Sequence, residues 1–363
     1  MKTLLTTLII LVAFAYPALA KTEFGKLGAA EFRIDVPANW NHGLVLYCHG
    51  YDAHEVGVGY DEKKPLPPEL QVFVNDGYAL AQTGYSAGGW AIEQAIPDIE
   101  ALRKHFIETY GQPKETFITG HSMGGLLTVA LIETSPQIYD AGLDMCGAVE
   151  SAPKLLSRGF DVRVLFDYYY PGLLPGPTKI PKDFELTEQL SKKTFNAVRA
   201  KPQAAAAIRK LTGIHNDKDL TGTIVLVTYI LKEIQQRAGG NPFDNRDTIY
   251  SGSADDNALN DGVKRYAAAP NAIAYLKRYL TLNGHLTRPV LAIHTTYDPL
   301  VSPAVPNGYS LLTREAGAGD LFVQQYVKHD GHCAINAAET EKGFQELRHW
   351  KDTHQAPKAG WLQ

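Results

Sequence analysis

The sequence predicts an α/β fold with a mainly parallel sheet, helices on both of its faces, and a large helical insertion before one of the last strands. Two observations carry this prediction. Strand and helix signals alternate up to residue 150 and again after residue 287, which is typical of a parallel sheet whose crossovers are helices. Residues 151–286, in contrast, have helical periodicity and no convincing strand signal, as expected of a cap inserted between two strands.

Composition and charge are those of an ordinary globular protein. The 363 residues are 45% hydrophobic and 20% charged, and they allow two ordinary domains or one large domain with an insertion. The formal net charge is −4 without a basic run, which argues against a nucleic-acid partner. After the N-terminus the longest apolar run, residues 224–231, is far too short to span a membrane and is interpreted as a core helix.

The N-terminus has the anatomy of a secretory signal peptide. Lys2 supplies a positive charge, residues 4–14 form an apolar core, and residues 18–20 are the small-residue cleavage site Ala-Leu-Ala. A Tyr-Pro pair ends the apolar run before it reaches the length of a membrane anchor. We therefore expect residues 1–20 to be removed by cleavage after Ala20, and a secreted or periplasmic protein.

The first strands of the predicted sheet are short and separated by helices. An apolar, β-prone run at 44–47 leads into a loop rich in Gly, Asp and His that begins Cys-His-Gly-Tyr. A helix ending near residue 74 precedes a strand at 78–81. An amphipathic helix at 92–106 then precedes a strand at 116–119.

The rest of the chain continues this alternation around the insertion. A helix is expected at 126–133, strands at 142–149, 289–294 and 321–327, and a last helix at 337–354. Within the insertion we expect helices at 184–199, 202–211, 220–237 and 271–282, and a stiff Pro/Gly-rich segment at 161–181. The predicted domains are therefore a main domain of residues 21–150 and 287–363 and a helical cap of residues 151–286.

Two serines lie in the pattern G-x-S-x-G, in which the glycines allow a sharp strand-to-helix turn that exposes the serine oxygen. Ser86 is in Gly-Tyr-Ser-Ala-Gly and Ser122 is in Gly-His-Ser-Met-Gly, and both follow a strand. An oxyanion loop normally follows the strand two before the nucleophile's, and residues 49–51 fit that loop. Counting strands from there selects Ser122 as the nucleophile and leaves Ser86 in a tight turn near the rim of the cleft.

A serine of this kind needs a histidine as base and a carboxylate to orient that histidine. Asp298 follows a late strand, and His332 lies in the loop after the last strand, so both are where such groups are required. The competing candidates His329, Asp330 and Asp320 are interpreted as strand-end, turn or loop residues.

With these residues in this order, the chain resembles the α/β-hydrolase superfamily of serine hydrolases. The resemblance implies the α/β-hydrolase fold, an acyl-enzyme formed on Ser122, and an oxyanion hole made by the N–H groups of Tyr51 and Met123. Nothing in the sequence requires an organic cofactor. A metal is not required either, because a helix N-cap explains the acidic stretch 253–262. The residues expected near the substrate are His49, Gly50, Ser86, Trp90 and His121.

A second similarity, at Gly331-His332-Cys333, is to tannases and feruloyl esterases. Their active sites join a cysteine before the serine to a cysteine after the histidine. His121 stands before Ser122 here, so that disulfide cannot form. A Cys48–Cys146 bridge is not expected either, because the usual strand order separates these residues by two strand spacings, beyond the reach of a disulfide.

The predicted function is a secreted serine carboxylester hydrolase for medium-sized apolar or aromatic esters, small or polymeric. Tyr168, Tyr169 and Tyr170 are expected to wall the cleft and favour such acyl groups, or alternatively to seat the cap on the main domain. The other functions considered are a serine peptidase, with Glu150 as a candidate for binding an amine, and a non-catalytic binding module. The oligomeric state is left open.

Overall fold

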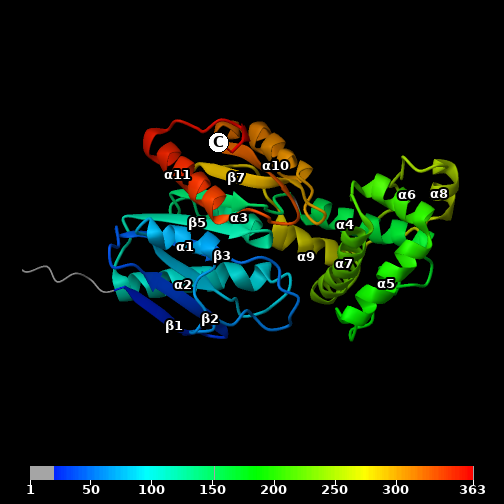
Figure 1. Cartoon of the computed structure of the whole chain (residues 1–363), viewed down its shortest axis with the longest axis horizontal. Helices are drawn as coiled ribbons and strands as arrows, with labels where there is room; N and C mark the ends of the chain where they lie inside the picture. Colours follow the sequence, from blue (N-terminus) through cyan, green and yellow to red (C-terminus); the bar gives the residue numbers. More distant parts are fainter. Residues whose placement is uncertain (1–19, 151, 363) are drawn as a thin grey trace, which may run out of the picture.

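The computed structural model describes residues 20–150 and 152–362, so the expected signal peptide, apart from Ala20, lies outside the described residues. The described chain forms a nine-stranded sheet in the order β1-β2-β4-β3-β5-β6-β7-β8-β9 (Figure 1). Strand β2 pairs antiparallel with both β1 and β4, and all the other neighbours are parallel. In chain order the strands are β1 (Lys21–Leu27), β2 (Ala30–Val36), β3 (Gly43–Cys48), β4 (Ala79–Thr83), β5 (Glu115–His121), β6 (Ala141–Met145), β7 (Val290–Tyr297), β8 (Phe322–Asp330) and β9 (Gly360–Trp361).

Helices cover both faces of the sheet because its central strands are apolar on both sides. Leu44 and Leu46 belong to one core cluster, whereas Val45 between them belongs to the other, since successive side chains of a strand point to opposite faces. The first cluster is covered by α2 (Ile92–Tyr110), α3 (Met123–Thr134) and α10 (Ala304–Glu315), and the second by α1 (Pro68–Asn75) and α11 (Ala337–Thr353).

Between β6 and β7 the chain leaves the sheet and forms a helical insertion. Figure 1 shows α5, α6 and α8 to one side of the sheet, with α4, α7 and α9 nearer to it. Part of the insertion has an apolar cluster of its own, which includes Phe166, Val198 and Ile224. The helices are α4 (Ala152–Tyr169), α5 (Glu188–Ala200), α6 (Pro202–Thr212), α7 (Asp217–Ala238), α8 (Asp256–Gly262) and α9 (Pro270–Leu280).

Several segments differ from the sequence prediction. Helix α10 and strand β9 were not predicted, and the strand predicted at 142–149 ends at Met145. Residues 21–36, for which no strand was predicted, form the antiparallel pair β1–β2 at one edge of the sheet. The segment 161–181 is not a loop throughout, because α4 continues to Tyr169 and the prolines come only after it. Apart from these segments, the strand order, the parallel pairing from β4 to β9 and the helices on both faces confirm the predicted α/β-hydrolase fold. Within the described residues, no helix is long and apolar enough to cross a membrane.

Candidate active site

Ser122 occupies a strained turn between β5 and α3. Its φ and ψ angles are 57° and −117°, a conformation that costs energy in a non-glycine residue and marks functional sites. The glycines on either side let the end of β3 come close. A Cβ on Gly124 would lie 1.9 Å from the carbonyl oxygen of Cys48, and one on Gly120 would lie 2.5 Å from the same oxygen. This backbone is the one that the G-x-S-x-G pattern predicts.

The second G-x-S-x-G segment has the same letters but a different backbone. Its positive φ falls on Tyr85 and not on Ser86. The N–H of Ser86 donates to a carboxylate oxygen of Asp98 at 2.7 Å. A Cβ on Gly84 would lie 1.7 Å from the carbonyl oxygen of Val58, so this glycine accommodates a neighbouring loop. Ser86 is therefore part of a packed turn, and it does not line the cavity described below.

Ser122, His332 and Asp298 form a continuous chain of hydrogen bonds. His332 Nε2 lies 2.8 Å from Ser122 Oγ, and His332 Nδ1 lies 2.6 Å from Asp298 Oδ2. The other oxygen of Asp298 accepts the N–H groups of Leu300 and Val301 at 2.8 and 2.9 Å. A proton on Nδ1 that is donated to the carboxylate leaves Nε2 free to accept the serine hydroxyl.

The surroundings of Asp298 keep it ionised. Its side chain is fully buried, and burial alone would raise its pKa. The hydrogen bond with His332 and the two backbone N–H groups more than offset that effect, so the pKa of Asp298 lies below its ordinary value. An ionised carboxylate at this point stabilises an imidazolium on His332.

The competing histidine and carboxylates lie elsewhere. His329 Nε2 lies 2.9 Å from Glu339 Oε1. Asp330 is the exposed last residue of β8, and Asp320 lies in a short turn of 3₁₀ helix before that strand. The structure thus brings Asp298, and not these residues, to His332.

The loop after β3 lies against the turn that carries Ser122. A Cβ on Gly50 would be 3.2 Å from the carbonyl oxygen of His121 and 3.4 Å from Ser122 Cβ. Tyr51 follows Gly50, and Met123 is the first residue of α3, where backbone N–H groups have no partner within the helix. The oxyanion hole expected from Tyr51 and Met123 remains a prediction.

Two histidines flank this loop and turn. The ring of His49 stacks on Tyr85, with centroids 3.9 Å apart, and His49 does not line the cavity. His121 does line it, and its Nδ1 lies 3.2 Å from the hydroxyl of Tyr47. Burial lowers the pKa of both histidines, and the nearby His332 also lowers that of His121, to about 4. His121 is therefore uncharged beside Ser122 at neutral pH.

Cys333 is disulfide-bonded to Cys146, which directly follows β6, and their Cα atoms are 5.3 Å apart. Cys48 is free and buried. The prediction that Cys48 and Cys146 do not pair is confirmed, and β5 lies between their strands as expected. The sequence analysis did not identify the Cys146–Cys333 pair. The available signal was that Cys146 follows the strand next to the one that leads to Ser122, while Cys333 follows His332.

A cavity of about 880 Å³ opens beside the three residues. The main domain contributes Gly50, Tyr51, Trp90, His121, Ser122, Asp298 and His332 to its wall. The insertion supplies mostly aliphatic side chains from α4 and α7, among them Leu155, Val162, Leu226, Val227 and Ile230, together with the charged residues Arg158 and Asp161.

The predicted tyrosine wall is not part of this cavity. The Tyr168 hydroxyl donates to the carbonyl oxygen of Ala258 at 3.4 Å, and the ring of Tyr169 packs edge-on against Tyr168. Tyr170 is buried, and its hydroxyl donates to the carbonyl oxygen of Lys201 at 3.1 Å. The prediction that these tyrosines line the cleft is therefore wrong, because the end of α4 places them among the other helices of the insertion.

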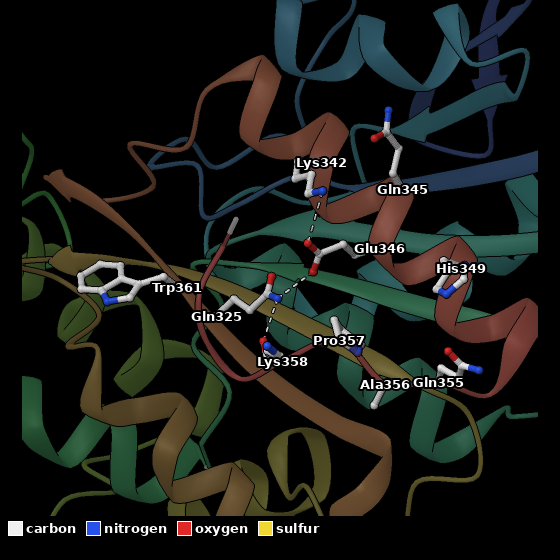
Figure 2. A pocket seen from close by; sticks show the side chains of 10 residues that line it. All are labelled: Gln325, Lys342, Gln345, Glu346, His349, Gln355, Ala356, Pro357, Lys358 and Trp361. Carbon is white, nitrogen blue, oxygen red and sulfur yellow. Dashed lines mark hydrogen bonds and ion pairs between the residues drawn. The ribbon is translucent and has the colours of Figure 1, made fainter.

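A second, smaller cavity of about 370 Å³ lies between β8, α11 and the C-terminal segment (Figure 2). Gln325 crosses it, and its amide nitrogen donates to Glu346 Oε2 and to the carbonyl oxygen of Lys358 at 2.7 and 2.9 Å. This cavity shares no residue with the one beside Ser122.

The acidic stretch at 253–262 is used as a helix start. Asp255 caps α8 by accepting the N–H of Ala258 at 3.0 Å, as predicted. Asp256 accepts the N–H of Ser253 at 2.8 Å. In the part of the chain that the structure describes, no group of three His, Cys, Asp or Glu side chains is arranged to hold a metal ion.

Comparisons with known proteins give likeness in three dimensions only. No family model and no curated protein matches the sequence. An esterase from Pyrococcus furiosus is similar at a TM-score of 0.49 and 13% identity, over 92% of this chain and 91% of that one. Feruloyl esterase B from Aspergillus oryzae has a TM-score of 0.49 and 15% identity, over 92% and 80% of the two chains. A puromycin-hydrolysing peptidase from Mycobacterium tuberculosis has a TM-score of 0.49 and 11% identity, over 94% of this chain but 41% of that one, so this chain spans less than half of that peptidase.

Proposed function

We propose that this protein is a secreted serine carboxylester hydrolase in which Ser122 is the nucleophile, His332 the base and Asp298 the residue that orients the base. The observation that carries the proposal is the continuous hydrogen-bond chain from Asp298 through His332 to Ser122, at the mouth of a mostly apolar cavity. A serine hydroxyl is activated in this way for attack on a carbonyl carbon.

The proposed reaction proceeds through an acyl-enzyme. Ser122 Oγ attacks the ester carbonyl carbon while its proton moves to His332 Nε2, and the carbonyl oxygen becomes an oxyanion held by the N–H groups of Tyr51 and Met123. The carbon–oxygen bond to the alcohol then breaks, and His332 gives the proton to the departing alkoxide. Water attacks the acyl-enzyme by the same route, releasing the acid and restoring Ser122.

The cavity wall suggests the acyl group. Side chains of α4 and α7 such as Leu155, Val162 and Ile230 offer aliphatic surface on the insertion side of the cavity. Burial of apolar surface contributes about 25 cal/mol per Å², so a medium-sized apolar acyl chain gains affinity there. We propose such esters as substrates, with aromatic acyl groups held by the same aliphatic wall and not by the predicted tyrosines.

Two features support export. The first twenty residues have the pattern of a cleaved signal, and the Cys146–Cys333 disulfide is of a kind that persists in oxidising compartments. Strand β1 begins at Lys21, so cleavage after Ala20 leaves it intact. We propose that residues 151–286 then act as the cap of the mature enzyme.

The test combines a probe with a substrate series. The wild type should react with a fluorophosphonate and hydrolyse p-nitrophenyl esters of graded acyl length. Ser122→Ala should abolish labelling and lower kcat by about 10⁴–10⁶-fold, whereas the control Ser86→Ala should keep most of the activity. A wild type without labelling and ester hydrolysis would point instead to the non-catalytic binding module.

A serine peptidase is the second candidate, and Asp161 is the observation in its favour. Glu150, the amine-binding residue considered first, is buried beside Lys154 and Arg158, at 2.7 and 3.3 Å, and does not line the cavity. Asp161 does line it, and its Oδ1 accepts the hydroxyl of Tyr250 at 2.7 Å. Higher kcat/KM on amino-acid anilides than on matched esters, lost in Asp161→Asn, would favour the peptidase.

A further inference from the structure

Glu233 on α7 of the insertion is hydrogen-bonded to two loops of the main domain. Its Oε2 accepts the hydroxyl of Tyr51 at 2.8 Å, in the loop that follows β3. Its Oε1 accepts the backbone N–H of Trp90 at 2.8 Å, in the loop that follows β4. The same Oε1 accepts Nε of Arg237, one helical turn further along α7, at 2.8 Å.

The carboxylate is enclosed by the loop that it binds. A Cβ on Gly89 would lie 1.8 Å from Glu233 Oε1 and would displace the carboxylate, and the φ of this glycine, +73°, favours glycine by its conformation. Arg237 adds two hydrogen bonds to the same region, from Nη2 to the carbonyl oxygen of Gly88 at 2.7 Å and from Nη1 to Gln94 Oε1 at 3.1 Å.

The two loops are also joined to each other. The N–H of Gly89 donates to the carbonyl oxygen of Asp52 at 2.7 Å, one residue beyond Tyr51. Tyr51 and Trp90 both line the large cavity, and their rings are 6.5 Å apart. Oε2 of Glu233 therefore holds the loop that carries the backbone N–H of Tyr51, and Oε1 holds the loop after β4, which is itself bonded to the first loop at Asp52.

The N-terminal part of α7 is hydrogen-bonded to the segment that carries Asp298. Asp219 Oδ2 accepts the hydroxyl of Tyr297 at 2.9 Å, and the Thr223 hydroxyl donates to the carbonyl oxygen of Pro299 at 3.2 Å. Tyr297 and Pro299 are the neighbours of Asp298. Ten residues of helix separate Thr223 from Glu233, a rise of about 15 Å. Helix α7 thus connects the loop of Asp298 to the loop of Tyr51.

From these contacts we propose that Glu233 is a positioning residue for the oxyanion hole. Through the Tyr51 hydroxyl and the Trp90 N–H it holds the loop after β3 so that the N–H of Tyr51 faces the oxyanion formed on the substrate. This inference rests on the proposed function and adds to it that the insertion supports catalysis as well as binding the acyl group.

The geometry shows which substitution removes both contacts. Both oxygens of Glu233 accept hydrogen bonds, from an O–H on one side and from two N–H groups on the other. A glutamine could keep them, because its oxygen can accept the N–H groups while its NH₂ group donates to the hydroxyl oxygen of Tyr51. Glu233→Leu has no acceptor and a side chain of similar size, so it should release both loops.

The test measures stabilisation of the oxyanion separately from stability of the fold. Glu233→Leu should lower kcat on the best p-nitrophenyl ester by about 10–100-fold with KM within about threefold, because displacing an oxyanion donor costs up to about 10²–10³-fold. Tyr51→Phe, which removes only the hydroxyl, should lower kcat by about tenfold. Both should keep the far-UV spectrum of the wild type, and the milder Tyr51→Phe covers the case in which Glu233→Leu does not fold.

A matched control removes the same kind of hydrogen bond at another contact between the insertion and the main domain. The Tyr279 hydroxyl on α9 donates to Glu93 Oε1 on α2 at 2.8 Å. Tyr279→Phe should leave kcat and KM within about twofold of the wild type.

The second readout is a short-chain trifluoromethyl ketone, to which Ser122 adds to give an adduct with a negatively charged oxygen. Its inhibition constant should rise in Glu233→Leu and Tyr51→Phe by the same factor by which kcat/KM falls, because the adduct resembles the transition state. Binding of the product acid should not change to that extent.

The results separate failure of this inference from failure of the proposed function. Wild-type kcat and ketone affinity in both variants would overturn the role of Glu233 while leaving the hydrolase in place. The role of Glu233 would also be overturned if the two variants lost no more activity than Tyr279→Phe, or if only their KM changed. If wild-type enzyme neither hydrolyses esters nor binds the ketone, the proposed function itself is wrong.

Discussion

Cys333 is joined by a disulfide to Cys146, so the residue that follows His332 is covalently fixed to the end of β6. Strand β6 is the direct neighbour of β5, which carries Ser122 at its end. His332 is thus held by its hydrogen bond to Asp298, and its neighbour Cys333 is bonded to the end of the strand beside β5. The two cysteines are 187 residues apart, so this bond closes a very long loop of chain.

Reduction of this disulfide should lower both stability and activity. Removing a native disulfide typically costs about 2–5 kcal/mol of the free energy of unfolding. We expect a decrease in that range in the double variant Cys146→Ala/Cys333→Ala, and a lower kcat because the loop of His332 loses its anchor. Urea unfolding with and without a reductant measures the first effect. Cys48→Ala should still respond to the reductant, and an unfolding midpoint of the wild type that ignores it would contradict the prediction.

Asp298→Asn should fold and be severely slowed. A neutral amide cannot stabilise the imidazolium and can favour the wrong histidine tautomer, and in a comparable triad this change lowers kcat by about 10⁴-fold. Steady-state kinetics on one ester, with the melting temperature as a check on folding, are sufficient. Asp330→Asn, in the exposed residue two positions before His332, is the control and should cost far less. Equal rates for the two variants would mean that another carboxylate orients His332.

Because of Asp144, the free energy of unfolding should fall as pH rises from acid to neutral values. Burial raises the pKa of this carboxyl to about 8, although the N–H of Gly147 opposes the shift. Its Oδ1 has no hydrogen-bond partner among the described residues. The pKa of Asp144 is higher in the folded than in the unfolded chain, so Asp144 contributes its full amount to the free energy of unfolding below about pH 4. This contribution is lost as pH rises towards 8, by at most about 1.4 kcal/mol per pH unit.

Asp144→Asn should remove this dependence. Urea unfolding at pH 5 and at pH 8.5 should show the variant gaining stability relative to the wild type at the higher pH. Asp320→Asn changes an exposed carboxylate and serves as the reference. If the stability difference between Asp144→Asn and the wild type is the same at both pH values, Asp144 does not titrate in this range.

Acyl preference should respond to α7 and not to the tyrosines of α4. Ile230 lines the cavity, so Ile230→Trp should fill part of it and shift the optimum of kcat/KM towards shorter acyl chains, by about tenfold or more for long ones. Tyr170→Phe removes hydrogen bonds inside the insertion and should cost about 1 kcal/mol of stability without changing that preference. A changed acyl-chain optimum in Tyr170→Phe would contradict this prediction and indicate that Tyr170 contacts the substrate.

The central sheet could be predicted because its strands are buried on both faces. Runs such as 44–47 are apolar without alternation and end at loops rich in Gly and Asp. The edge pair β1–β2 was missed because its strands carry many polar residues on the exposed side. Helix α4 was missed because three tyrosines and nearby prolines suggested a loop, although the prolines come only after the helix ends.

The candidate site was predicted by position more than by motif. Ser86 and Ser122 have the same local pattern, and only the count of strands separated them. Asp298 and His332 were chosen because they follow strands, and the structure places them within hydrogen-bond distance of each other. The contacts of Glu233 could not be predicted, since they depend on how a helix of the insertion lies over two loops more than 140 residues earlier in the chain.

The position of the insertion in the chain also determines the order in which the sheet can be assembled. Met145 ends β6 and Val290 begins β7, and these two strands are neighbours. During synthesis the edge of β6 therefore stays without its partner until the whole insertion has been made. An unpaired strand edge invites pairing with other chains, so this nascent form is exposed to aggregation. The helices of the insertion pack on one another and can form in that interval, before the last strands pair with β6.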